Sequence, residues 1–303
     1  MDSRQSGAGR IKIGIIWALS LVVTAVVAWF GSSRIQGGAT ANAGSPSVRR
    51  QMLVAEMRMN LARAAEMEKC AVLSDRDEES ANFADQSKRA SAAVDHDLGR
   101  LRKLIGEQGT GRERELLGKF ELSWKSVKQI DDSLLVAAPQ NTNVKAIELS
   151  GTIGAELIQK FHENLGKAAV KVTPLSKRLE MEKLAGQAEG AMLSIAQLQM
   201  RHIHAPSVTE KTALENPMND ARKKAEAALK SMEAVSGKKG NPLLNGAATV
   251  LGEFMQLNEE IVRLSKIDSN YWSAEVSLGK RRLADTECDR ELKELQKLGA
   301  EQP

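Results

Sequence analysis

The stretch VKAIELSGTIGAELIQKFHENLGKAAVKV, residues 144–172, decides the fold class of this chain. Its apolar and small residues step alternately by three and four positions, the spacing of a helix that packs along its whole length against other helices. These residues are Val144, Ile147, Gly151, Gly154, Ile158, Phe161, Leu165, Ala168 and Val172. Glycines weaken a helix and leave a hollow on its surface. The pattern therefore predicts a bundle helix with a bulky neighbour beside Gly151 and Gly154.

The composition of the 303 residues also favours an all-helical protein. Aromatic residues make up 3% of the chain and there are 7 prolines, which is unlike a β-sandwich or an α/β enzyme. The net charge of +4 comes from interspersed charges of both signs, so the basic stripe of a nucleic-acid binder is missing from the sequence. The sequence also lacks the GxSxG, GxxxxGK[ST], GxGxxG and HExxH motifs. We therefore expect neither an enzyme nor a cofactor.

An uncharged apolar run, IGIIWALSLVVTAVVAWF, occupies residues 13–30 and has the length that a bilayer requires. Basic residues are concentrated before it, so the positive-inside rule predicts a cytoplasmic segment 1–12, a transmembrane anchor 13–30 and an extracytoplasmic remainder. The predicted location is the inner membrane, with a single pass. A cleaved signal peptide is the competing interpretation, because Val26 and Ala28 fit a small-residue cleavage pattern. Residues 31–47, rich in Gly, Ala and Ser, are predicted to be a flexible linker.

Four helical segments of heptad-like pattern follow, and then the pattern starts again. With a shift of 134 residues, Phe120 matches Phe254 and the first three helices share one register; the fourth matches with a shift of 127. The sequence therefore predicts two tandem up-down-up-down four-helix bundles, residues 48–173 and 174–303, joined at Thr173-Pro174. An alternative treats the two helices that flank this joint as one kinked rod.

Two short runs suggest a family. The run Lys69–Ser80, KCAVLSDRDEES, at the first turn of the bundle and the run Ala146–Ser150, AIELS, at its fourth helix resemble the four-helix-bundle sensor domains of bacterial methyl-accepting chemotaxis receptors and related sensor kinases. The resemblance implies a periplasmic module that binds a small molecule or an envelope or signalling protein, often as a homodimer. The chain departs from that family because its fourth helix leads into a second bundle and no signalling domain follows.

The two repeats differ in their predicted cores. Trp124 and Gly154 of the first repeat correspond to Asn258 and Arg281 of the second, and Asp285 lies one turn beyond Arg281. We expect Trp124 to fill the glycine hollow in the first bundle, and Asn258, Arg281 and Asp285 to form a polar layer in the second. Such a layer could hold an anionic or zwitterionic ligand. The competing interpretations are an exposed Arg281–Asp285 surface pair and a polar layer that only fixes the helix register.

Other reactive side chains give weaker signals. Met200 and His204 share a helix face, which raises a copper hypothesis, but His202 points elsewhere and Met192 fits the core, so no metal is predicted. The paired aromatics Tyr271 and Trp272 are either a partner surface or a turn-capping cluster. Cys70 and Cys288 lack any metal or haem motif and are expected to be small, buried helix residues, with a disulfide between them as the alternative.

Overall fold

The computed structural model describes residues 45–237 and 241–300, and within these ranges every regular element is helical. This confirms the all-α class. The predicted anchor 13–30 and most of the linker 31–47 lie outside the described residues. Among the helices that are described, none combines the length and apolarity needed to cross a membrane.

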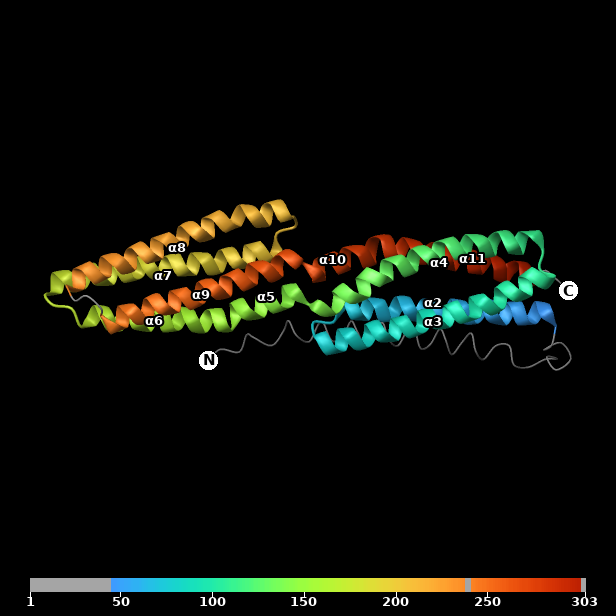
Figure 1. Ribbon diagram of the computed structural model, residues 1–303, viewed down its shortest axis with the longest axis horizontal. Coiled ribbons are helices and arrows are strands. Elements are labelled where there is room, and N and C mark those ends of the chain that lie inside the picture. The colour runs from blue at the N-terminus through green and yellow to red at the C-terminus, as the bar shows by residue number, and fades with distance from the viewer. Residues whose placement is uncertain (1–44, 238–240, 301–303) are drawn as a thin grey trace, which may run out of the picture.

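Helices make up nearly the whole of the described chain (Figure 1). A Ser45 cap, with Pro46 in the first turn, opens the first of them. Their bounds are α2 Pro46–Leu73, α3 Asp77–Gln108, α4 Gly111–Ala137, the 3₁₀ turn η1 Ala138–Gln140, α5 Thr142–Gly151, α6 Ile153–Val170, α7 Leu175–His204, α8 Val208–Ser236, α9 Pro242–Ile267, α10 Ser269–Val276, the π-turn η2 Ser277–Arg281, and α11 Arg282–Ala300.

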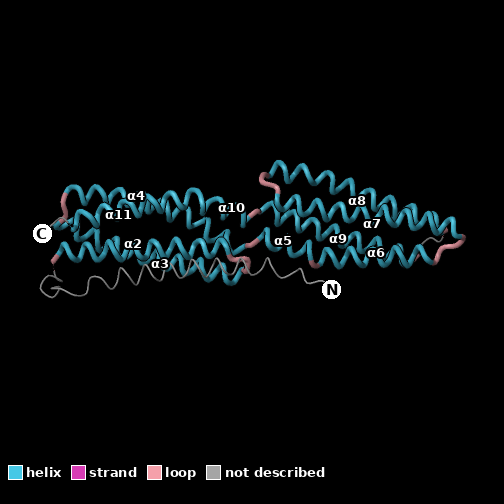
Figure 2. The backbone as a smooth tube through the Cα atoms, turned by 180° about the vertical axis from the view of Figure 1, so that it is seen from behind, coloured by secondary structure: helices cyan, strands magenta, loops and turns pink. Residues whose placement is uncertain are grey.

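These helices group into two four-helix bundles that lie end to end in one rod (Figures 1 and 2). The terminal bundle consists of α2, α3, α4 and the continuous α10–η2–α11 segment. The inserted bundle consists of the α5–α6 segment with α7, α8 and α9. We call the point where they meet the waist, and define it by residues 141–143 and 268–270.

The predicted division at residues 173/174 is therefore wrong. Residues 142–267 form the inserted bundle as one continuous piece, and the terminal bundle is completed only by the last helix of the chain. The error has a simple cause: the connection after α4 was expected to reverse the chain. Instead η1 and Asn141, in a left-handed conformation (φ 47°), lead the chain straight on into the other bundle. Thr173-Pro174 lies in the turn between α6 and α7, so the kinked-rod alternative is also wrong.

The glycine hollow is filled differently from the prediction. Trp124 belongs to the terminal bundle, where its ring stacks on Phe120 with centroids 6.2 Å apart. Gly154 belongs to the inserted bundle, and a Cβ there would lie 3.8 Å from the Leu257 side chain and 3.9 Å from Phe254. Gly151 has open space around it. Trp124 therefore cannot be the residue that fills the hollow beside Gly154.

The fourth helix of each repeat is irregular at the equivalent position. The helix regularity breaks at Thr152, between α5 and α6, and the equivalent segment of the second repeat is the π-turn Ser277–Arg281. The buried face shifts across the break: Ile147 is 38% exposed, whereas Phe161 and Leu165 are fully buried as predicted. In the second repeat the wider π-turn aligns residues spaced by four, and so turns Arg281 into the core.

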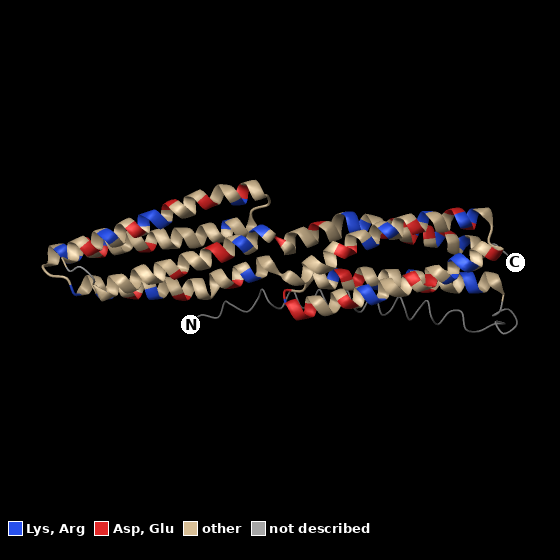
Figure 3. Cartoon of the chain, viewed as in Figure 1, with Lys and Arg blue, Asp and Glu red and all other residues tan. Residues whose placement is uncertain are grey.

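The described ends of the chain meet far from the waist. Ser47 Oγ donates a hydrogen bond to the Gly299 carbonyl oxygen at 3.3 Å, so α2 begins where α11 ends. Lys and Arg alternate with Asp and Glu along the surfaces of both bundles (Figure 3). Exposed ion pairs within helices, such as Lys119–Glu115, account for many of these charges.

Candidate functional site

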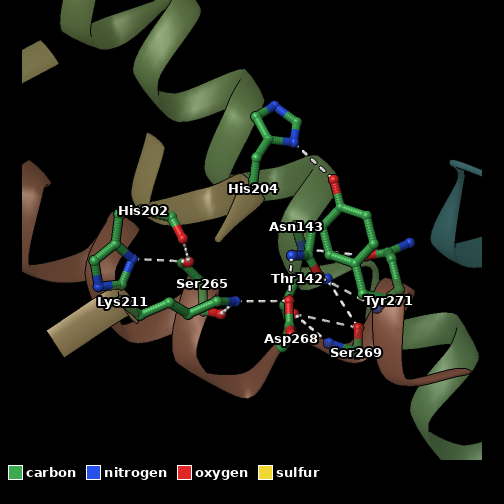
Figure 4. Close-up of polar contacts among 10 residues, drawn as sticks. Thr142, Asn143, His202, His204, Lys211, Ser265, Asp268, Ser269 and Tyr271 are labelled. Carbon is green, nitrogen blue, oxygen red and sulfur yellow. Dashed lines mark hydrogen bonds and ion pairs between the residues drawn. The ribbon is translucent and has the colours of Figure 1, made fainter. Parts of the chain in front are cut away.

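The waist is held by reciprocal hydrogen bonds between two equivalent helix starts (Figure 4). The Thr142 amide donates to Ser269 Oγ at 3.1 Å, and the Ser269 amide donates to Thr142 Oγ1 at 3.0 Å. Asn143 and Asn270 exchange the same kind of bond through their Oδ1 atoms, at 3.1 and 3.2 Å. Each partner lies 127 residues from its equivalent, which is the shift that the sequence predicts for the fourth helices. These bonds satisfy the otherwise unpaired amides of two first turns.

The waist bonds can be tested singly. Ser269→Ala removes the acceptor of the buried Thr142 amide, and we expect the free energy of unfolding to fall by about 1–2 kcal/mol in urea denaturation. Ser126→Ala is the matched control, because the exposed Ser126 hydroxyl bonds only to the Leu122 carbonyl of its own helix. An equal effect of the two substitutions would contradict a special role for the waist.

A buried lysine supports the waist from the inserted bundle. Lys211 is 1% exposed; its Nζ donates to the Ser265 carbonyl oxygen at 2.6 Å and lies 2.8 Å from Asp268 Oδ1 (Figure 4). Its equivalent in the first repeat is Asp77, which accepts a hydrogen bond from Asn141 Nδ2 at 3.2 Å. The second helix of each repeat, α3 or α8, therefore carries a charged residue in its first turn. That residue binds Asn141 or Asp268, the left-handed residue at which the chain passes from one bundle to the other.

A buried ionic cluster lies on the terminal-bundle side of the waist. Arg281 is 0% exposed; its Nε donates to Asp131 Oδ1 at 2.6 Å and its Nη2 to Asp131 Oδ2 at 3.2 Å. Its Nη1 pairs with Asp285 one turn along the helix. The guanidinium is thus already used by two carboxylates. Removing an arginine and a carboxylate from water costs several kcal/mol of hydration free energy. The attraction between the two charges offsets this cost only when the geometry of the pair is good.

Glu68 adds a third carboxyl group to this cluster. It is 0% exposed, and neither carboxylate oxygen has a hydrogen-bond partner with acceptable geometry. Burial raises the pKa of Glu68, and the nearby Ser277 and Arg281 lower it by less. One arginine cannot neutralise three carboxylates, so the cluster holds more acceptors than donors.

The inserted bundle has a corresponding polar layer with different chemistry. A shift of 134 places His202 where Glu68 stands and Ser265 where Asp131 stands. His202 is 0% exposed, and its Nδ1 lies 2.9 Å from Ser265 Oγ, which itself donates to the His202 carbonyl oxygen. In the same bundle, Ser150 Oγ donates to Gln199 Oε1, and Gln199 Nε2 donates to Asn258 Oδ1 at 3.0 Å.

The predicted polar layer of Asn258, Arg281 and Asp285 is therefore wrong as a single site. Asn258 lies in the inserted bundle with Gln199, whereas Arg281 and Asp285 lie in the terminal bundle. The surface-pair interpretation is also wrong, because Arg281 is fully buried. Asp131 and Glu68 were not predicted from the sequence. Both carried a signal: a charged residue on a stripe of otherwise buried positions, Ala64–Glu68–Ala71 and Val127–Asp131–Leu134.

A groove between α3 and α4 leads to this cluster from the surface. It has a volume of about 380 Å³ and is lined by Ser91, Ala92, Asp131, Leu135 and Val136, among others. Ser91 Oγ is buried there without a hydrogen-bond partner. The groove therefore gives solvent-sized molecules access to the edge of Asp131, whereas the fully buried Arg281 and Glu68 do not line it.

The remaining candidate side chains are separate. His204 Nδ1 lies 2.7 Å from the Tyr271 hydroxyl on the surface, while His202 faces the interior (Figure 4). Tyr271 and Trp272 are 45% and 38% exposed. Within the described ranges, no group of three or more His, Cys, Asp or Glu side chains is arranged to hold a metal ion. Cys70 and Cys288 are both free; Cys288 is buried, as predicted, whereas Cys70 is only partly buried.

No protein-family model matches this sequence, and no similar curated protein was found.

Proposed function

We propose that the chain is a membrane-anchored, extracytoplasmic sensory module that binds a small ligand near its waist and has no output domain of its own. The buried ionic cluster is the observation that carries the proposal. Its desolvation is costly, and a donor from outside would satisfy the Ser91 hydroxyl, which is buried without a partner in the groove that ends at Asp131. The resemblance to chemoreceptor sensor domains supports the same role.

The cluster also narrows the ligand chemistry. Because two carboxylates already occupy Arg281, an anion would find no free donor there. The exposed end of the α3–α4 groove adds Asp132, and its lysines Lys88 and Lys128 pair with Asp85 and Asp95. A small ligand with an ammonium or another donor group, together with a short apolar part against Leu135 and Val136, fits this lining.

A thermal-shift screen of residues 45–303 with small amines, amino acids and carboxylates tests the proposal. A ligand present at about 100 times its Kd should stabilise the fold by about 2.7 kcal/mol. Ser91→Leu should abolish this shift, because the larger side chain fills the groove. Ser194→Leu, which lines a different groove between α7 and α8, is the matched control and should leave the shift intact. A shift that survives Ser91→Leu would place the ligand elsewhere.

A structural or adaptor role is the second candidate, and one feature of α2 favours it. Met52 and Met59 are 56% and 66% exposed and, with the exposed Ala55 and Ala62, form a heptad stripe on the outer face of the helix. Such a stripe suits a helical partner, either another envelope protein or a second copy of the chain. A stable partner in a pull-down that Met59→Glu disrupts, with no ligand shift in the screen, would favour this role.

A further inference from the structure

Glu68 and His202 occupy equivalent positions of the two repeats, one on each side of the waist. Both side chains are fully buried, and both have atoms that make no hydrogen bond of normal geometry: the two carboxylate oxygens of Glu68, which lie near Ser277, and Nε2 of His202, which lies 3.8 Å from Glu215 Oε1. Few buried polar atoms in a folded protein lack a partner. Each bundle therefore contains, at the same place, one titratable group whose bonding a single proton would change.

The charged surroundings of Glu68 come from several elements. Arg281 on the π-turn and Asp131 on α4 act on it with opposite sign, and Lys69 acts from α2 itself. Beside Glu68 the helix α3 contributes the buried Ser80 and Ser87 hydroxyls, which donate to the Ala71 and Ala64 carbonyl oxygens, while Asp85 and Lys88 pair with each other at the surface. The α10 helix adds the buried Ser269 and Ser273, and Asp285 of α11 is held by Arg281. Arg281 is shared by Asp131 and Asp285, and burial outweighs the attraction of Arg281 and Lys69, so the neutral, protonated form of Glu68 is the one that suits the interior.

The surroundings of His202 define where its proton would go. The Ser265 hydroxyl donates its hydrogen to the His202 carbonyl oxygen. In the neutral ring, Nδ1 therefore donates to Ser265 Oγ, and Nε2 carries the lone pair. That lone pair faces Glu215 Oε1 of α8 at 3.8 Å. Lys211 of α8 and Lys266 of α9 oppose a positive ring, and Lys266 Nζ holds Glu215 at 2.8 Å. The α5 helix faces this layer with Ala146 and Ser150, and Arg201 of α7 is exposed.

We propose that Glu68 and His202 are a matched pair of proton-binding sites, so that acid loosens the inserted bundle and alkaline conditions loosen the terminal bundle. The inference goes beyond the ligand-binding role proposed above and does not depend on it. The two groups act in opposite directions because each is buried in its neutral form, and one is an acid and the other a base.

The direction of each effect follows from proton linkage. Burial raises the pKa of Glu68 above its ordinary value of 4.5, so its contribution to stability is complete below pH 4.5 and is lost as the pH rises towards the folded-state pKa. Burial lowers the pKa of His202 below its ordinary value of 6.5, and Lys211 adds to this while Glu215 opposes it. The His202 contribution is therefore complete above pH 6.5 and is lost as the pH falls towards its folded-state pKa.

Hydrogen exchange of the full chain, followed by mass spectrometry from pH 4 to pH 9 and corrected for intrinsic exchange rates, resolves the two bundles. Below pH 6.5 the protection of α7–α9 should fall by up to about tenfold per pH unit, and His202→Gln should remove this dependence. Above pH 4.5 the protection of α2–α4 should fall in the same proportion, and Glu68→Gln should remove that dependence. His162→Gln and Glu66→Gln, which change exposed residues of the two bundles, are the matched controls.

Unchanged profiles in both variants, or the same change in both bundles, would overturn the inference. Should a variant fail to fold, the wild-type chain still decides the matter. An NMR titration in which the His202 ring takes its proton near pH 6.5, or in which Glu68 ionises near pH 4.5, would also overturn it. Because no small molecule is added, these outcomes are independent of the ligand screen.

Discussion

Replacing Arg281 by methionine should lower the free energy of unfolding by about 3–5 kcal/mol at pH 7, the cost of leaving buried carboxylates without their cation. Asp131 and Asp285 both pair with this guanidinium, and Glu68 lies beside it. Urea denaturation of residues 45–303 measures the loss. The loss should shrink at pH 4, because protonated carboxyl groups need no countercharge.

Two comparisons isolate the electrostatic cause. Arg282→Met changes an exposed neighbour that bonds only to the Leu278 carbonyl, and should cost less than about 0.5 kcal/mol. Adding Asp131→Asn and Asp285→Asn to Arg281→Met should recover most of the stability, since the unpaired charges are then gone. If the triple variant is no more stable than Arg281→Met alone, lost packing rather than charge is the cause.

A second large effect concerns fragments of the chain. Residues 142–267 should fold alone as a helical bundle, because α5–α6, α7, α8 and α9 share one core. Residues 174–300, which correspond to the second sequence repeat, should remain largely unfolded or aggregate. They include α11 but lack the helices it packs against. Circular dichroism melts and light scattering after size exclusion distinguish the two outcomes.

Residues 174–300 have one alternative way to form a bundle, and the structure disfavours it. In residues 174–300, α11 could in principle replace its equivalent α6 against α7 and α9. Arg281 would then take the place of Gly154, where even a Cβ would be within 4 Å of Phe254 and Leu257. It would also meet Ser265 in place of its partner Asp131. A cooperative melt of residues 174–300 as a monomer would contradict the inserted arrangement.

The sequence was sufficient for the helices and for the repeat. Apolar periodicity predicted the segments, and the shift of 127 reappears in the bonds between Thr142 and Ser269. It could not decide which bundle each fourth helix joins, because an apolar stripe has the same spacing whichever core it faces. That choice depends on backbone conformation at Asn141 and Asp268, both in the left-handed region.

The candidate site was predictable only in part. Arg281 and Asp285 were singled out because they replace small and apolar residues of the first repeat. Their real partners, Asp131 and Glu68, come from helices more than a hundred residues away along the chain, and periodicity alone cannot match a charge on one stripe with a charge on another. The π-turn shifts the helix register and turns Arg281 inward, and this shift was not predicted from the sequence.

The placement of α11 also constrains the order of assembly during synthesis. The inserted bundle is made of consecutive residues, so its contacts are local in sequence and can form as soon as Ile267 has been made. The terminal bundle has to wait for the last helix, which begins 145 residues after α4 ends, or roughly 7–30 s at ordinary elongation rates. During that interval the apolar faces of α2 and α4 that receive Leu292 and Leu295 are uncovered. A nascent chain of this kind therefore exposes an apolar surface early and covers it last.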